Sequence, residues 1–276
     1  MPAADRKNTR RKKNMEQTKD TLELALVQGD IKSGDVSANL QYYGKKITAG
    51  SPADLWVLPE TFATGFSYEA SATARPDGQI ILDWLRQTAQ EQHTAICGSA
   101  VVVDGDKKYN RFYLADATGR VQHYDKRHLF SYGNEGRRIS AGTSRALWEL
   151  HGWKIMPTVC YDLRFPVWSR NDRYYDLMLC VANWPESRIA AWDTLLRARA
   201  IENMAYVAAV NRIGRDSLDS LHTGHSVALT PLGKALTPEK NTEETVIRAT
   251  VSLSRIRTIR EKYGFLEDRD SFEIEP

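Results

Sequence analysis

The chain has 276 residues, of which 42% are hydrophobic and 26% charged, with seven Trp and twelve Tyr. This composition excludes disordered, collagen-like and fibrous proteins. A chain of this size buries about three quarters of the surface that its unfolded form exposes, so it needs no disulfides to fold.

The formal net charge of +3 is unevenly distributed. Residues 1–14 hold six Lys or Arg and one Asp, so they carry +5 and the remaining chain carries −2. The near-neutral body offers no basic face, so we expect no nucleic-acid partner. The arm lacks the apolar core of a signal peptide, and no apolar run approaches the roughly 20 residues that span a bilayer. We interpret residues 1–20 as a basic leader and expect no membrane association; a phosphate-binding or localisation arm is the alternative.

The cysteine pattern favours a reducing compartment. Cys97, Cys160 and Cys180 are odd in number and show no paired spacing, so we predict a cytoplasmic protein without disulfides. His222 and His225 are only three residues apart, but no further ligand is near them in sequence. We interpret both as loop histidines and predict no metal site.

Short apolar runs alternate with helical patterns along the chain, without an internal repeat or linker. Runs that are apolar on consecutive residues are usually buried on both faces, and their alternation with helices predicts an α/β layered fold. The many strands late in the chain predict two sheets rather than one. Strands are expected at 22–27, 53–58, 94–103, 111–115, 153–159, 176–182, 206–210, 226–230 and 246–251, and helices at 36–49, 80–92 and 189–205.

Reactive side chains follow three of these apolar stretches. Glu60 comes after the second predicted strand, where a carboxylate is costly to bury unless it is partnered. Lys126 lies among aromatic residues, and Cys160 follows a strand and precedes a polar turn that we expect to open a helix. Such an elbow exposes a side chain beside backbone N–H groups. Cys97 and Cys180 lie within predicted strands, and we interpret them as small hydrophobic residues.

Taken together, these segments resemble the carbon–nitrogen hydrolase (nitrilase) superfamily, which uses Glu, Lys and Cys in this order. The resemblance covers roughly residues 22 to 265, and within the superfamily it is strongest to the bacterial omega-amidases. It implies a single-domain, four-layer α-β-β-α sandwich over residues 21–266, followed by a tail at 267–276, and a homodimer. The matching segments are Leu58–Phe62, Tyr124–Phe130, Cys160–Asn171, Val181–Pro185, Arg197–Asn203 and Arg260–Tyr263.

The resemblance also implies the roles of the site residues. Cys160 is expected to be the nucleophile and Glu60 the general base, while Lys126 and the backbone N–H of Tyr161 hold the developing oxyanion. Glu135 is expected to support Lys126, although its match is looser and a solvated loop carboxylate is the alternative. This chemistry needs no metal and no organic cofactor.

A small dicarboxylate-like substrate needs an apolar slot and a cationic end. We expect Phe66, Phe130, Tyr161 and Trp184 to form the slot. Arg188 and Arg164 are the candidates for holding a carboxylate, since guanidinium binds it in a two-pronged way. Arg188 could instead cap the helix that follows, and Asp162 and Arg164 could pair with the backbone or with each other.

The sequence therefore predicts a thiol amidohydrolase that releases ammonia from the terminal amide of 2-oxoglutaramate or 2-oxosuccinamate through a thioester. The same three residues would also serve a nitrile, an N-carbamoyl amino acid or another small amide as substrate. A non-catalytic binding protein on this fold is a further alternative, which the presence of Glu60, Lys126 and Cys160 disfavours.

Overall fold

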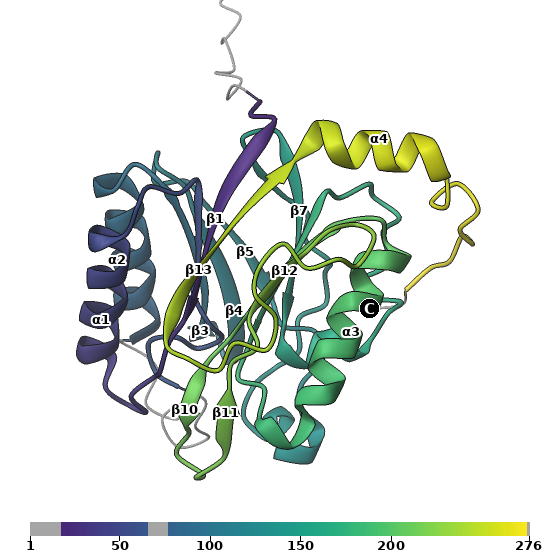
Figure 1. Ribbon diagram of the computed structural model, residues 1–276. Coiled ribbons are helices and arrows are strands. Elements are labelled where there is room, and N and C mark those ends of the chain that lie inside the picture. The colour runs from purple at the N-terminus through teal and green to yellow at the C-terminus, as the bar shows by residue number, and fades with distance from the viewer. Residues whose placement is uncertain (1–17, 66–76, 275–276) are drawn as a thin grey trace, which may run out of the picture.

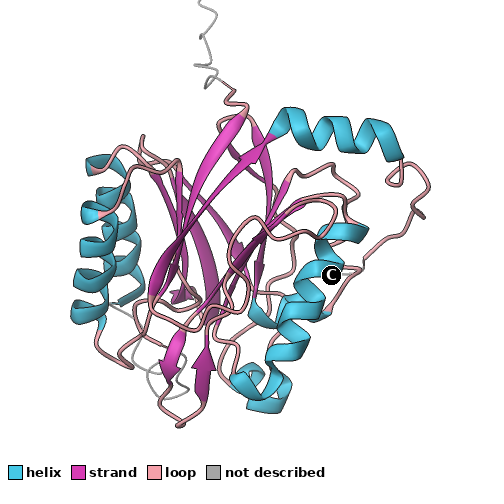
Figure 2. Cartoon of the chain, in the orientation of Figure 1, coloured by secondary structure: helices cyan, strands magenta, loops and turns pink. Residues whose placement is uncertain are grey.

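Two β-sheets stack face to face, and helices cover the outer side of each (Figures 1 and 2). This computed structural model describes residues 18–65 and 77–274. The predicted four-layer α-β-β-α arrangement is confirmed. Within the described ranges, no helix is long and apolar enough to cross a membrane.

The first sheet has six strands in the order β13-β1-β2-β3-β4-β5. Its central strands β1, β2 and β3 run parallel, and the others pair antiparallel with their neighbours. Helices α1 and α2 cover its outer face (Figure 1). The bounds are β1 Thr21–Gln28, α1 Val36–Ala49, β2 Leu55–Val57, α2 Asp77–Glu91, β3 Ala95–Asp104, β4 Lys107–Ala115, β5 Val121–Asp125 and β13 Thr245–Ser252.

The second sheet has five strands in the order β12-β9-β8-β7-β6, and α3 and α4 lie on its side of the molecule (Figure 1). A separate two-stranded hairpin, β10–β11, lies beyond the end of β9. The bounds are β6 Trp148–Leu150, β7 Trp153–Val159, β8 Leu177–Ala182, α3 Ile189–Glu202, β9 Tyr206–Asn211, β10 Ile213–Arg215, β11 Leu221–Thr223, β12 Val227–Leu229 and α4 Leu253–Tyr263.

Alternation along β1 shows why most of the strand is apolar. Leu22, Leu24 and Leu26 belong to the core between the two sheets, whereas Ala25 and Val27 pack toward the outer helices. Successive side chains of a strand point to opposite faces, so a strand covered on both faces needs both sets to be apolar. The prediction of a strand buried on both faces is thus confirmed for β1.

Five of these helices and strands were absent from the prediction: β5, β6, β10, β11 and α4. In α4 only Leu253 and Ile256 are buried, so its sequence carries too narrow an apolar stripe for the helical period to show. The hairpin strands have three residues each and are partly exposed. The helix expected after Cys160 was wrong in kind, because Cys160–Arg164 forms only a short 3-10 helix.

A single buried carboxylate, that of Asp162, holds the bend after β7. It accepts hydrogen bonds from the backbone N–H groups of Val159 (3.0 Å) and His128 (2.9 Å) and from the hydroxyl of Tyr124 (2.8 Å). The predicted pairing of Asp162 with backbone is confirmed. Cys160 follows with φ of 46°, a left-handed conformation that a residue with a side chain adopts only when its surroundings impose it.

We predict that Asp162→Ala strongly destabilises the fold. The substitution leaves several buried donors without an acceptor, so the free energy of unfolding should fall by about 3 kcal/mol or more. Urea denaturation measures the change. Asp106→Ala is the matched control, because Asp106 is exposed in the β3–β4 turn and its loss should change stability by less than about 0.5 kcal/mol. Equal losses in both variants would contradict the assigned role of Asp162.

Candidate active site

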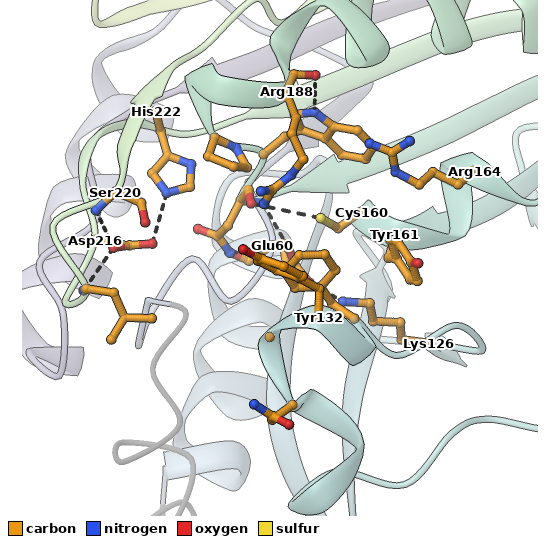
Figure 3. A pocket seen from close by; sticks show the side chains of 17 residues that line it. Glu60, Lys126, Tyr132, Cys160, Tyr161, Arg164, Arg188, Asp216, Ser220 and His222 are labelled. Atoms are coloured by element: carbon orange, nitrogen blue, oxygen red, sulfur yellow. Dashed lines mark hydrogen bonds and ion pairs between the residues drawn. The ribbon is translucent and has the colours of Figure 1, made fainter.

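A pocket of about 350 Å³ lies where several strands of both sheets end (Figure 3). Glu60 comes shortly after β2, Lys126 directly after β5, Cys160 directly after β7 and Asn183 directly after β8. Residues of the β10–β11 hairpin complete the wall. The structure therefore brings together the three residues that the sequence placed far apart, at the lining of one cavity.

Glu60 is fully buried. Among the described residues, the groups that hydrogen-bond to its carboxylate all donate to it. Its Oε1 accepts from Nδ2 of Asn110 at 2.8 Å and from Nζ of Lys126 at 2.9 Å. Its Oε2 accepts from the backbone N–H of Asn183 at 2.8 Å. These donors replace the water that a buried carboxylate loses. Asn110 lies just before the strand predicted at 111–115 and was not expected in the site, and Asn183 was noted only as part of a motif.

Lys126 is buried between two carboxylates. Its Nζ lies 2.9 Å from Glu60 Oε1 and 3.0 Å from Glu135 Oε2, and all three side chains are at most 1% exposed. Burial disfavours the ammonium form, but the charges of Glu135 and Glu60 outweigh burial and raise the pKa of Lys126 well above its ordinary value. Glu135 also accepts the backbone N–H of Phe130 at 2.7 Å, so it is not the solvated loop carboxylate of the alternative interpretation.

Cys160 presents its thiol to the same cavity. Its Sγ lies 3.9 Å from the carbonyl oxygen of Asn183, a long contact even for sulfur. Burial and the negative charge of Glu60 raise the pKa of Cys160 well above its ordinary value, although Lys126 opposes them. The free protein therefore holds a thiol, not a thiolate, at neutral pH. No group of three His, Cys, Asp or Glu suited to a metal occurs among the described residues.

The other two cysteines lie away from this cavity lining. Cys97 and Cys180 are unpaired and fully buried in β3 and β8, as small hydrophobic residues would be. Burial raises the pKa of both thiols. The predicted absence of disulfides thus agrees with three free cysteines in the structure.

Aromatic rings form part of the pocket wall. Phe130, Tyr161 and Trp184 all line the cavity, as expected from the sequence. The ring centroids of Phe130 and Tyr161 are 5.3 Å apart in an edge-to-face arrangement. Phe66, the fourth aromatic residue expected there, lies outside the described residues.

Two arginines line the pocket without an acidic partner among the described residues. The guanidinium carbon of Arg164 lies 4.9 Å from the ring centroid of Trp184, and that of Arg188 lies 5.0 Å from the ring centroid of Phe130. Arg164 therefore does not pair with Asp162. The side chain of Arg188 makes no capping hydrogen bond to the helix that follows it. Both guanidinium groups keep donors for an anion in the cavity.

The β10–β11 hairpin brings a polar pair that the sequence analysis did not place in the site. His222 lies on β11 and Asp216 precedes it, and both line the pocket (Figure 3). The interpretation of His222 as a loop histidine was therefore wrong. His225 lies outside the pocket, where its Nδ1 is 3.0 Å from Asp193 of α3.

The comparisons with known proteins all indicate the same family. The sequence model described as carbon-nitrogen hydrolase matches residues 23–261. Omega-amidase YafV of Yersinia enterocolitica is 42% identical over 252 residues, which are 91% of this chain and 98% of the relative. The 2-oxoglutaramate amidase of Bacillus subtilis (strain 168) is 35% identical over 251 residues, 89% and 96% of the two chains.

A solved structure agrees with these relatives. XC1258 from Xanthomonas campestris, described as a CN-hydrolase superfamily protein with an arsenic adduct in the active site, is 42% identical and superposes with a TM-score of 0.88. The match covers 92% of this chain and 99% of that one. Because the family match and these similarities span most of its length, the chain belongs to the carbon–nitrogen hydrolase family and is a hydrolase of carbon–nitrogen bonds.

Proposed function

We propose that the protein is an omega-amidase, which releases ammonia from the terminal amide of small 2-oxo dicarboxylic acid ω-amides such as 2-oxoglutaramate and 2-oxosuccinamate. The observation that carries the proposal is the cavity that holds together the Cys160 thiol, the buried Glu60–Lys126 pair and Arg188, which has no acidic partner among the described residues. Cys160 and the Glu60–Lys126 pair provide the groups that amide hydrolysis needs, and Arg188 provides a binding site for a carboxylate. The names of the relatives from Yersinia and Bacillus support the same substrate class.

The reaction begins with a protonated thiol, since the pKa of Cys160 is raised. Glu60 accepts the thiol proton as Sγ attacks the amide carbon, and then gives it to the departing ammonia. The enzyme is left as a thioester on Cys160. Glu60 next removes a proton from water, whose oxygen attacks the thioester, and returns that proton to the sulfur as the carboxylic acid leaves.

Lys126 stabilises the negative charge that develops on the amide oxygen. Its pKa is raised, so it stays protonated throughout the neutral range and acts as a fixed positive charge. The backbone N–H of Tyr161, directly after the nucleophile, is the second donor in this proposal. Glu135 holds Lys126 from the other side, with both carboxylate oxygens within 3.1 Å of Nζ, and so acts as a positioning residue.

The substrate chain is proposed to lie against Phe130, Tyr161 and Trp184, with its carboxylate on Arg188 or Arg164. Each arginine already stacks on an aromatic wall residue, which restricts the guanidinium group before substrate arrives. A cavity of about 350 Å³ suits a small dicarboxylate. A homodimer and a cytoplasmic location, which the resemblance and the cysteines suggested, remain part of the proposal.

The substrate class and the nucleophile are tested together by ammonia release. Wild type should act on 2-oxoglutaramate and only weakly on glutamine, a simple nitrile and an N-carbamoyl amino acid. Cys160→Ala should abolish activity, whereas Cys97→Ala, which removes a buried thiol outside the pocket lining, should keep it. A faster rate on the nitrile would overturn the substrate assignment. Undiminished activity of Cys160→Ala would overturn the nucleophile assignment.

The role of Glu60 is tested by Glu60→Gln, which keeps the shape of the side chain. Loss of the base should lower kcat by at least about 10²-fold. The same change removes a negative charge that raises the pKa of Cys160, so alkylation of Cys160 by iodoacetamide should move to lower pH. Slower turnover together with faster alkylation at neutral pH is the expected pair of results. Slower alkylation would contradict the proposed electrostatic contact.

The carboxylate site is tested by Arg188→Met. Loss of a charge-assisted contact should raise KM for 2-oxoglutaramate by roughly tenfold or more, with a smaller effect on kcat. Arg86→Met is the matched control, because Arg86 is exposed on α2. If Arg188→Met leaves KM unchanged and Arg164→Met raises it, the carboxylate belongs on Arg164; if neither variant changes KM, the proposed cationic end is wrong.

A further inference from the structure

The part of the pocket wall that the β10–β11 hairpin forms contains His222, whose ring is held in place by Asp216. Nε2 of His222 lies 3.1 Å from Oδ2 of Asp216, while Oδ1 of Asp216 accepts the backbone N–H groups of Leu218 (2.9 Å) and Ser220 (3.0 Å). A carboxylate only accepts hydrogen bonds, so Nε2 of His222 carries the hydrogen. The ring is 3% exposed, and these contacts fix its orientation.

The other ring nitrogen, Nδ1, makes only a weak contact among the described residues, with the backbone of Trp184. Nδ1 of His222 is buried and has no hydrogen-bond partner in the part of the chain that the structure describes. The Trp184 carbonyl lies close enough to favour a proton on the ring without forming a regular hydrogen bond. A buried polar atom without a partner is uncommon in a folded protein, and it indicates a group that a ligand completes.

The position of the pair fits the far end of the substrate. In Figure 3, His222, Asp216 and Ser220 lie on one side of the cavity, and Cys160, Tyr161 and Lys126 lie on the other. A substrate whose amide carbon lies at Cys160 therefore extends toward the hairpin.

We propose that His222, braced by Asp216, is a specificity-determining residue whose Nδ1 binds the 2-oxo oxygen of the substrate. The inference rests on the proposed function and deepens it, because it names the group that distinguishes a 2-oxo acid amide from the corresponding amide without the oxo group. The carboxylate remains with the arginines, so the two adjacent groups of the 2-oxo acid are recognised by different elements of the fold.

The chemistry requires a protonated ring. A 2-oxo group and a carboxylate offer only acceptors, so His222 binds them as the imidazolium, donating from both nitrogens. In the free protein, burial lowers the pKa of His222 and nearby Arg212 lowers it further, while Asp216 and the Trp184 carbonyl oppose them. Arg188 lines the same cavity and adds positive charge. The imidazolium would also repel the ammonium group of glutamine, which disfavours the 2-amino analogue.

Two variants separate recognition from a structural role. His222→Gln keeps an amide near the position of Nε2, where it can bond to Asp216, but leaves nothing at the position of Nδ1. His222→Asn does the reverse, with an amide near the position of Nδ1 and no bond to Asp216. Recognition by Nδ1 predicts that the Gln variant is defective and that the Asn variant keeps most function. A merely structural role predicts the opposite order.

The readout is kcat/KM for 2-oxoglutaramate and for glutaramate, which differ only in the 2-oxo oxygen. Wild type should prefer the former; His222→Gln should reduce that preference by roughly tenfold or more, and His222→Asn by less than about threefold. The rate on glutaramate should fall less than the rate on 2-oxoglutaramate, and an unchanged circular dichroism spectrum shows that the variants fold. If wild type hydrolyses 2-oxoglutaramate and His222→Gln keeps the wild-type preference, this inference is overturned and the proposed function stands. A wild type inactive on both amides overturns the proposed function as well.

The pH dependence gives an independent readout. Binding raises the pKa of His222 above its value in the free protein, so affinity is greatest at low pH and falls as pH rises through that free value. KM for 2-oxoglutaramate should therefore rise with pH more steeply than KM for glutaramate. In His222→Gln the two slopes should be equal, and slopes that stay different in that variant would contradict the assignment.

Discussion

The burial of three charged side chains in one cluster is the constraint on which the site depends. Lys126 lies between Glu60 and Glu135, and none of the three is more than 1% exposed. Buried charges are tolerated only when partners replace the lost water, and removing one partner leaves an uncompensated charge. The remaining acceptor positions of Glu60 take donors from Asn110 on β4 and Asn183 after β8, so both sheets have to meet at this point.

The same cluster determines how the thiol is activated. A lone cation beside Cys160 would lower the pKa of the thiol and produce a standing thiolate. Here Lys126 keeps its ammonium charge between two carboxylates, and burial together with the charge of Glu60 raises the pKa of Cys160 more than Lys126 lowers it. The arrangement therefore favours proton transfer to Glu60 during attack over a preformed thiolate. It also leaves the positive charge of Lys126 available for the amide oxygen, whose charge appears only in the transition state.

The fold class could be predicted because its signals are local, and the pocket residues could be named because short motifs carry them. Helix α1 forms over the residues that the periodicity indicated, and Glu60 and Cys160 each follow a readable apolar strand, whereas Lys126 follows β5, which was not predicted, and was found from its motif. Asn110 and His222 could not be predicted as pocket residues in this way. Each is one polar residue in a strand, and its place in the site depends on segments far away in sequence: Asn110 donates to Glu60, and His222 lines the same cavity as Cys160. A short hairpin such as β10–β11 has too few residues for a periodic pattern to emerge.

The pocket is thus assembled from two kinds of element with separate tasks. Glu60, Lys126 and Cys160 follow strands of the two large sheets, and all three side chains lie in or beside the buried charge cluster, so a change there disturbs that cluster. The hairpin that carries Asp216 and His222 is short, partly exposed and outside both large sheets. Changes in such a segment are tolerated by the fold more readily than changes in the core. If the proposed roles hold, recognition of the substrate can vary on this scaffold while the acid–base chemistry stays fixed, because the two functions lie on different elements of the fold.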